Sequence, residues 1–361
     1  MGVKNIFVVF FVEGMLMPYE AVDLFCGIGG LTKGLSLAGI NVLAGYDIDE
    51  TCKFAYEANN EAQFINQDVS DIQAEQLNNL YQDGHIKILV GCAPCQPFSR
   101  YSCRYRKNGR KDDKWKLLYS FARLVKECQP DIVSMENVPN LSDEQVFKDF
   151  VQNLEKQNYY VSWSVVFCPE YGVPQNRRRL VLLASKFGSI QLIDPEYKED
   201  NYPTVRKAIG NLPKINDGDI NKCDLLHSAS KLSTINKKRI KQSKPGGTWR
   251  DWDEDLILAC HNKETGKTYP SVYGRMEWDK PSPTITTQFY GYGNGRFGHP
   301  EQDRAISIRE GAILQSFPSD YIFIDEFHPA NKRELGMHIG NAVPVELGRA
   351  IGRTIKKHLD D

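Results

Sequence analysis

The chain has 361 residues, of which 41% are hydrophobic and 25% are charged, and its formal net charge is −1. These values are typical of a soluble globular protein of one large domain or two, and the average charge gives no sign of a polyanionic partner. The nine cysteines, in a long chain with no evident secretory signal, indicate reduced thiols in a cytoplasmic protein. The apolar run at residues 6–12 is too short to span a membrane.

The first half of the chain alternates short apolar runs with helical patterns, which predicts a doubly wound, mostly parallel α/β sheet. Right-handed crossovers bring the carboxyl ends of parallel strands to one edge, where ligands bind in open sheets. We therefore expect Phe25, Asp47, Asp68, Cys95 and Glu136 to line one rim. The predicted strands are 19–25, 41–46, 63–66, 86–90 and 131–135, and the predicted helices are 31–38, 52–59, 74–81, 117–128 and 145–157.

Two further strands are predicted at 159–167 and 179–185, and the pattern then becomes irregular and rich in Pro, Gly, Asn and Lys. An amphipathic helix follows Pro344, and it needs a surface to cover. We expect this helix to return to the first domain. The predicted division is an extra tail over 1–18, a catalytic and cofactor-binding domain over 19–185, a smaller irregular domain over 186–325, and a returning segment over 326–361.

A glycine-rich turn follows the first predicted strand, in the sequence Asp23-Leu-Phe-Cys-Gly-Ile-Gly-Gly30. Glycines at a strand–helix turn let a ligand approach backbone amides. The dinucleotide fingerprint would need glycine at position 32, which is Thr32, and this argues against a nicotinamide enzyme. Asp47, at the next strand end, can accept hydrogen bonds from ribose hydroxyls. The pattern favours a nucleoside-containing cofactor, and the alternative is a plain turn beside a surface acid.

Cys95 follows the fourth predicted strand, and Glu136 follows the fifth. Cys92 and Cys95 form a C-x-x-C pair, but zinc usually needs a second closely spaced pair, and we predict no metal site. A redox pair and a buried structural cysteine remain alternatives for Cys95. Its position between prolines at a strand end favours an exposed thiol that acts as a nucleophile. Glu136 is predicted to act beside it, with a simple cap as the alternative.

Arginines 177 and 179 share one face of a predicted strand, where they suit an anionic or carbonyl-bearing substrate. A basic strand edge that prevents aggregation is the alternative. Residues 100–116 carry eight Lys/Arg against two Asp, and residues 231–244 carry six with no acid. Such patches can bind phosphates, or they can be solvated loops.

The motifs DLFCGIGG, GCAPCQPFS, MENVP, QNRRR and IGNAVP, in this order, resemble those of the DNA (cytosine-5-)-methyltransferase family. The resemblance runs from about residue 19 to 357 and weakens between about 214 and 270. It implies the S-adenosylmethionine-dependent methyltransferase fold with a target-recognition domain. It also implies that Cys95 attacks cytosine C6, that Glu136 holds and protonates N3, and that Arg177 and Arg179 contact O2. The cofactor residues it implies are Asp23, Phe25, Gly27, Ile28, Gly30, Asp47, Ile48, Asp68, Val69, Pro94, Asn341 and Ala342.

The resemblance further implies methylation of C5 in a short duplex DNA sequence, with the cytosine flipped out of the helix. We expect a prokaryotic cytoplasmic monomer, with a restriction endonuclease as a possible companion. Alternatives are a transfer-RNA methyltransferase and an inactive DNA-binding regulator. Residues 100–116 are predicted to form a lid, and Cys26 and Cys92 are assigned no role. Candidate DNA contacts are Gln96, Ser99, Arg104, Arg106, Lys237, Arg239, Thr284 and Thr286.

Overall fold

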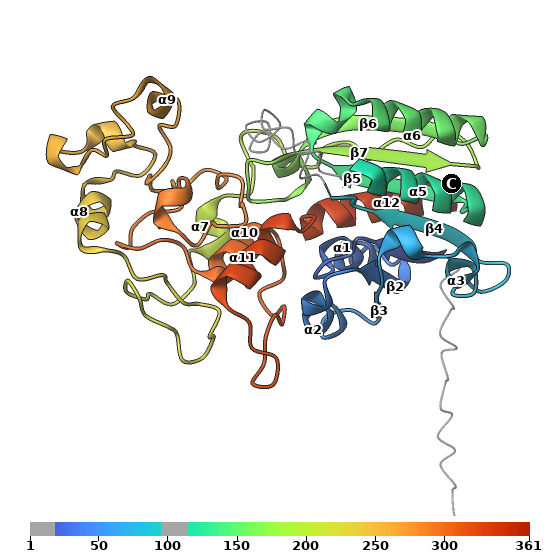
Figure 1. Cartoon of the computed structure of the whole chain (residues 1–361), viewed down its shortest axis with the longest axis horizontal. Helices are drawn as coiled ribbons and strands as arrows, with labels where there is room; N and C mark the ends of the chain where they lie inside the picture. Colours follow the sequence, from blue (N-terminus) through green and yellow to red (C-terminus); the bar gives the residue numbers. More distant parts are fainter. Residues whose placement is uncertain (1–18, 95–114) are drawn as a thin grey trace, which may run out of the picture.

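A seven-stranded sheet forms the centre of the structure, a computed structural model that describes residues 19–94 and 115–361. The strand order is β3-β2-β1-β4-β5-β7-β6. The first five strands in this order are parallel, and β7 runs antiparallel to both β5 and β6 (Figure 1). The prediction of a mostly parallel α/β sheet is confirmed. The strands are β1 (Tyr19–Leu24), β2 (Asn41–Asp47), β3 (Gln63–Asn66), β4 (Ile86–Gly91), β5 (Ile132–Asn137), β6 (Tyr160–Phe167) and β7 (Arg178–Ser185).

Helices cover both faces of this sheet. Successive strand residues alternate between two hydrophobic clusters: Ala21 packs in one with α1 and α12, and Val22 packs in the other with α5 and α6. This alternation follows from the pleat of a strand, whose successive side chains point to opposite faces. The helices of the sheet region are α1 (Gly30–Leu37), α2 (Lys53–Glu57), α3 (Ala74–Asn78), α5 (Lys116–Cys128), α6 (Gln145–Lys156) and, from the chain end, α12 (Val345–Asp360).

The C-terminal helix α12 lies directly along α1. A Cβ added to Gly34 of α1 would lie 2.5 Å from the backbone N of Arg349 and 2.5 Å from the carbonyl O of Val345. Only glycine allows the two backbones to approach so closely. The sixteen residues of α12, at the end of the chain, therefore help to cover one face of a sheet whose first strand begins at Tyr19.

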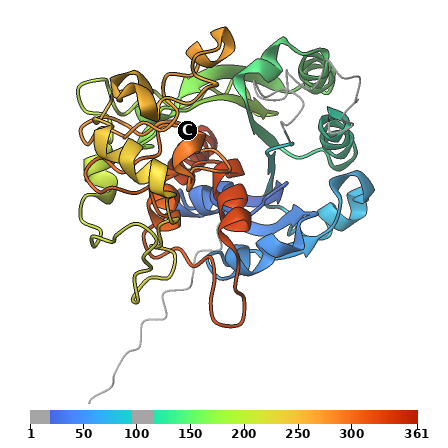
Figure 2. The same cartoon turned by 60° about the vertical axis from the view of Figure 1, so that its left-hand side comes forward.

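Residues 186–331, which we call the loop region, have short helices and isolated β-bridges but no strand ladder. Most of them gather at one end of the molecule (Figures 1 and 2), while the segment around Ile190 runs beside β6 and α12. Ile285, Phe289 and Ile306 join the same hydrophobic cluster as α1 and α12, so the loop region shares part of its core with the sheet region. The helices of the loop region are α7 (Val205–Ile209), α8 (Thr234–Gln242), α9 (Glu264–Lys267) and α10 (Ile308–Leu314). Helix α11 (Lys332–Asn341) follows the loop region and precedes α12.

Candidate active site and cofactor pocket

A cavity of about 350 Å³ opens at the carboxyl ends of β1, β2 and β4. The start of α5 and the segment that joins α11 to α12 complete its wall. Arg177 and Arg179 also line it. Of the rim predicted from the sequence, Phe25, Asp47 and Asp68 line the cavity, whereas Glu136 is not among its lining residues. The predicted cofactor residues on its wall are Asp23, Phe25, Gly27, Ile28, Asp47, Ile48, Asp68, Val69, Pro94, Asn341 and Ala342.

The turn after β1 shapes one side of the cavity. Phe25 (φ 61°) and Gly27 (φ 50°) both adopt left-handed backbone conformations. The Gly27 N–H donates to Oδ2 of Asp47 at 2.8 Å, which ties this turn to the end of β2. Gly30, the one predicted cofactor residue absent from the wall, is buried, and a Cβ there would lie 2.3 Å from the carbonyl O of Val343. In the structure, Gly30 allows its backbone to pack closely against that of Val343.

Two acids at this end of the sheet differ in how their oxygens are used. Asp47 accepts from the backbone N–H of Gly27 and, at 2.9 Å, from that of Asp49, and burial raises its pKa. Asp23 is 1% exposed and accepts from the Thr32 hydroxyl at 2.8 Å, while its Oδ1 has no hydrogen-bond partner among the described residues. Burial raises the pKa of Asp23 to about 7. A buried oxygen without a partner, on a cavity wall, is suited to a polar ligand.

Glu136, at the end of β5, is 2% exposed and has a polar side-chain group close to each carboxyl oxygen. Oε1 lies 2.7 Å from Nε of Arg179, and the Cys92 thiol lies 2.9 Å from Oε2. Arg179 comes from β7, the strand inserted beside β5. The sequence assigned no role to Cys92, yet the structure places its thiol on the carboxyl group that carries the predicted chemistry. The only sequence feature that singled out Cys92 was its C-x-x-C spacing, which suggests Cys95 as its partner and not Glu136.

Arg177 is buried in a polar network that connects three distant segments. Its Nη1 donates to Oε1 of Gln175 at 3.2 Å and to the Ile285 carbonyl at 3.1 Å, and Nη2 donates to the Gly340 carbonyl at 3.3 Å. Gln175 is fully buried and also donates to the Gln315 side chain at 2.5 Å. The network joins the segment just before β7 to the loop region, at Ile285, and to the cavity wall, at Gly340. Sequence reasoning did not find Gln175 or Gln315, because Gln175 meets Ile285 and Gln315 across 110 and 140 residues of the chain.

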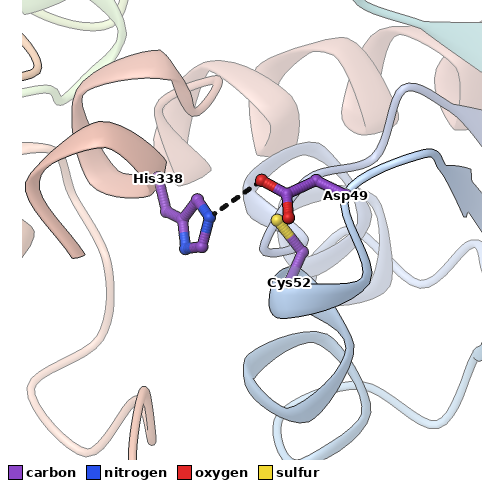
Figure 3. Close-up of side chains that lie close together, drawn as sticks. All are labelled: Asp49, Cys52 and His338. Carbon is purple, nitrogen blue, oxygen red and sulfur yellow. Dashed lines mark hydrogen bonds and ion pairs between the residues drawn. The ribbon is translucent and has the colours of Figure 1, made fainter. Parts of the chain in front are cut away.

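A second contact joins α11 to the end of β2, as Figure 3 shows. His338 Nε2 lies 3.2 Å from Oδ2 of Asp49 and 3.1 Å from the Thr51 hydroxyl, and Cys52 Sγ lies beside them. Asp49 also accepts from the Thr51 N–H at 3.1 Å and so caps a short 3₁₀ helix (Glu50–Cys52). We call this arrangement the His338 clasp, because it fixes the cavity wall near Asn341 against the Asp47 side.

Several predicted residues lie outside the described residues. These are the nucleophile Cys95, four candidate DNA contacts, and nearly all of the predicted lid over 100–116. The described chain reaches Pro94, on the cavity wall, and Asn137 next to Glu136 donates to the Ala93 carbonyl at 2.9 Å. The four DNA candidates are Gln96, Ser99, Arg104 and Arg106.

The other candidate DNA contacts lie in the loop region. Thr284 is half-buried and donates to the Asn176 carbonyl at 2.6 Å, and Thr286 is exposed. Lys237 is half-exposed and pairs with Asp217 at 2.7 Å. Arg239, in contrast, is 8% exposed, donates to the Leu256 carbonyl at 2.9 Å and stacks over aromatic rings. This position leaves its guanidinium little access to a phosphate.

Comparisons with known proteins agree with this geometry. A family model described as C-5 cytosine-specific DNA methylase matches residues 19–357. The type II methylase M.HgiDII of Herpetosiphon aurantiacus is 55% identical over 95% of this chain and 97% of its own. The type II methyltransferase M1.HphI of Haemophilus parahaemolyticus is 31% identical over 94% and 87%.

A prophage-encoded E. coli structure, described as a DNA modification methyltransferase, shares the fold. Its TM-score is 0.72 at 22% identity, with 95% of this chain and all of that chain covered. None of the described helices is long and apolar enough to cross a membrane. The family acts on cytosine C5 with S-adenosylmethionine as the methyl donor. The extent of the family match and the identity to M.HgiDII show that the chain belongs to the C-5 cytosine-specific DNA methylase family.

Proposed function

We propose that this protein methylates C5 of a cytosine within a short duplex DNA sequence, with Cys95 as the nucleophile and Glu136 as the acid. The observation that carries the proposal is the Glu136–Arg179 pair, at 2.7 Å, because Arg179 lines the cavity whose wall also has the predicted cofactor residues. One cavity then serves both reactants, which is what a direct transfer between them needs. Cys95 comes directly after Pro94 of the cavity wall.

The cavity wall has groups that fit S-adenosylmethionine. The ribose hydroxyls match the Asp47 carboxylate, as in other open α/β sheets. Ile48 is 68% exposed for an apolar residue on the wall, which suits the flat face of the adenine. The Oδ1 atom of Asp23, without a partner among the described residues, suits the ammonium group of the cofactor. When bound, the cofactor supplies a methyl group on a sulfonium.

The protein side chains make cytosine reactive toward that methyl group. The Cys95 thiolate adds to C6 while Glu136 gives its proton to N3, and C5 becomes enamine-like. After C5 takes the methyl group, which leaves the donor as the thioether S-adenosylhomocysteine, a base removes the C5 proton, the C5–C6 double bond forms again, the thiolate leaves and N3 returns its proton to Glu136. Such covalent catalysis replaces one difficult step by easier ones. The Glu136–Arg179 pair would hold the acid in place for this proton transfer.

Access to a paired base requires flipping, at a cost of a few kcal/mol. We assign target recognition to the loop region, because the Arg177 network connects its segment around Ile285 to the cavity. The division into a tail over 1–18, a catalytic domain over 19–185, a recognition domain over 186–325 and a returning segment stays a prediction. The lid over 100–116 and the phosphate contact by Lys237 stay predictions too.

Several relatives are named type II methylases or methyltransferases, and this suggests the biological setting. We infer that this enzyme is the modification component of a type II restriction-modification system and acts in the cytoplasm as a monomer. A restriction endonuclease would share its target sequence without needing to bind it.

The decisive experiment measures transfer of labelled methyl groups from the cofactor to duplex DNA and, separately, to transfer RNA. We expect transfer to DNA, its loss in a Cys95→Ser variant, and a strongly lowered but measurable single-turnover rate in a Glu136→Gln variant, with both variants keeping the wild-type melting temperature. Bisulfite sequencing of DNA from expressing cells then gives the target sequence. Transfer to RNA alone, or full activity of the Cys95→Ser variant, would contradict the proposal.

A further inference from the structure

Glu136 has chemically different partners at its two carboxyl oxygens. Oε1 faces the guanidinium of Arg179 at 2.7 Å, and Oε2 faces the thiol of Cys92 at 2.9 Å. Both arrangements are inside the protein, since Glu136 is 2% exposed. The two oxygens are therefore not equivalent, and this decides which of them can carry a proton.

A guanidinium is a permanent cation that only donates hydrogen bonds. It stabilises Oε1 as the charged oxygen and disfavours a proton there. The proton that Glu136 gives to a base must then reside on Oε2. A thiol can donate to Oε2 when the carboxyl group is ionised, and its sulfur can accept from Oε2–H when the group is protonated. Cys92 can therefore form a hydrogen bond with both the ionised and the protonated form of Glu136. A second cation could donate only to the ionised form.

The backbone fixes this thiol in place. The Cys92 N–H donates to the Leu24 carbonyl at 3.2 Å, directly after β4, and the next carbonyl, that of Ala93, accepts from Asn137. Cys92 also lines the cavity. Because β4 and β5 pair in register up to Gly91 and Met135, the thiol and the carboxyl group extend from neighbouring strand ends. The contact is thus a product of the sheet, and it does not depend on a flexible side chain.

We propose that Cys92 is a positioning residue that holds the proton-carrying oxygen of Glu136 toward the base in both of its protonation states. This inference rests on the proposed function, in which Glu136 acts on cytosine N3. Because a thiol sulfur is a weak acceptor, it is displaced by N3 as the acceptor of the Oε2–H hydrogen bond when the base enters. When Glu136 has given its proton to N3, the S–H of Cys92 donates to the new carboxylate. The thiol gains and loses no proton in the cycle.

The test is a double-mutant cycle in single-turnover methyl transfer to DNA. We expect Cys92→Ala to lower the rate at saturating cofactor by about three- to tenfold, the effect of one hydrogen bond. Cys92→Ser should restore most of the rate, because a hydroxyl also donates and accepts. In a Glu136→Gln background, Cys92→Ala should cause no further loss, since the group it positions is no longer an acid.

Cys128→Ala is the matched control, because Cys128 is a buried cysteine on α5 whose thiol contacts the Ala74 carbonyl. It should transfer methyl groups at the wild-type rate. Equal losses in Cys92→Ala and Cys92→Ser, an equal loss with and without Glu136, or no loss at all would overturn the inference. Failure of the proposed function is a separate result, because the wild-type protein would then transfer no methyl group to DNA.

Discussion

The sheet region and the loop region satisfy their backbone polar groups in different ways. In the sheet region, strand ladders pair the amides and carbonyls of residues far apart in the chain, and helices pair those of residues four apart. The loop region has no ladder, and buried arginines take over this task. Arg275 donates to the carbonyls of Ile240, Ser243, His299 and Gln302, and it also pairs with Asp303.

Arg304 and Arg309 have comparable roles. Arg304 is fully buried and donates to the carbonyls of Ile215 and Ala305, and Arg309 donates to the Tyr321 carbonyl. A buried carbonyl needs a donor, and a guanidinium offers five in a fixed geometry. The comparison shows that arginine side chains can supply donors to buried carbonyls in an irregular region, as a strand ladder does in a sheet. It follows that charge pairs should matter most for stability in the loop region, and site acids most in the sheet region.

The largest expected effect comes from Arg304→Met. Arg304 forms two hydrogen bonds of 2.7 Å with Glu310, and both residues are buried. Removal of the cation leaves an unpaired buried carboxylate, so we expect the free energy of unfolding to fall by roughly 3–5 kcal/mol. Urea denaturation measures it. The control is Arg206→Met, which breaks an exposed pair with Asp279 and should leave the midpoint in place. Equal shifts of the urea midpoint in the two variants would show that buried arginine pairs do not stabilise the loop region more than exposed ones.

The next effect concerns the pH dependence of the sheet region. Burial raises the pKa of Asp23 from 3.8 to about 7, so the native state holds a proton that the unfolded state has lost between these values. The contribution of this group to stability is present below pH 4 and is lost as the pH rises to about 7. Asp23→Asn does not titrate, so its stability relative to the wild type should rise across this window by up to about 4 kcal/mol.

Denaturation curves at pH 4.5 and pH 7.5, read as the difference between the two proteins, measure this change. A difference that is the same at both pH values would show that Asp23 is ionised throughout. Asp219→Asn, at a surface position of the loop region, is the control and should show no such trend.

A smaller effect is expected where α1 meets α12. Gly34→Ala adds a Cβ that would lie 2.5 Å from two backbone atoms of α12, so the helices must separate. Overpacking of this kind typically costs about 1–3 kcal/mol. Thermal unfolding measures it, and Ser36→Ala, exposed on the same helix, is the control. A melting temperature equal to that of the control would mean that α12 adjusts without cost.

The smallest effect concerns the His338 clasp. His338→Ala removes the hydrogen bonds to Asp49 and Thr51, each of the kind that contributes about 0.5–1.5 kcal/mol. We expect cofactor affinity to fall by about two- to tenfold, because one wall of the cavity is no longer held against the other. Isothermal titration with S-adenosylmethionine measures it. His328→Ala, an exposed histidine outside the cavity wall, should bind the cofactor as the wild type does.

The predicted elements of the sheet region agree closely with the structure, because buried parallel strands are apolar runs with clear borders. The strand predicted at 63–66 is β3 itself, and the helix predicted over 117–128 differs from α5 by one residue. The helix predicted over 52–59 is shorter and is preceded by a 3₁₀ turn, which Asp49 caps. Apolar spacing shows that a segment is helical, but a side-chain cap decides where the helix begins.

The site divides in the same way. Motifs at strand ends predicted most of the cofactor residues that line the cavity, because the carboxyl ends of parallel strands meet at one edge of the sheet. The contact of Cys92 with Glu136 and the burial of Arg239 were not predictable from local pattern, since each depends on segments that meet only in space. The Arg177 network was hidden for the same reason.

The sequence by itself determined the family, the order of elements in the sheet region, and which acids and arginines end at one rim. Apolar periodicity and short motifs encode these features locally. Only the tertiary structure decided that β7 lies between β5 and β6, so that Arg179 reaches one oxygen of Glu136 while Cys92 reaches the other. The reason is that strand order and side-chain contacts arise from packing between distant segments, and no local pattern carries that information.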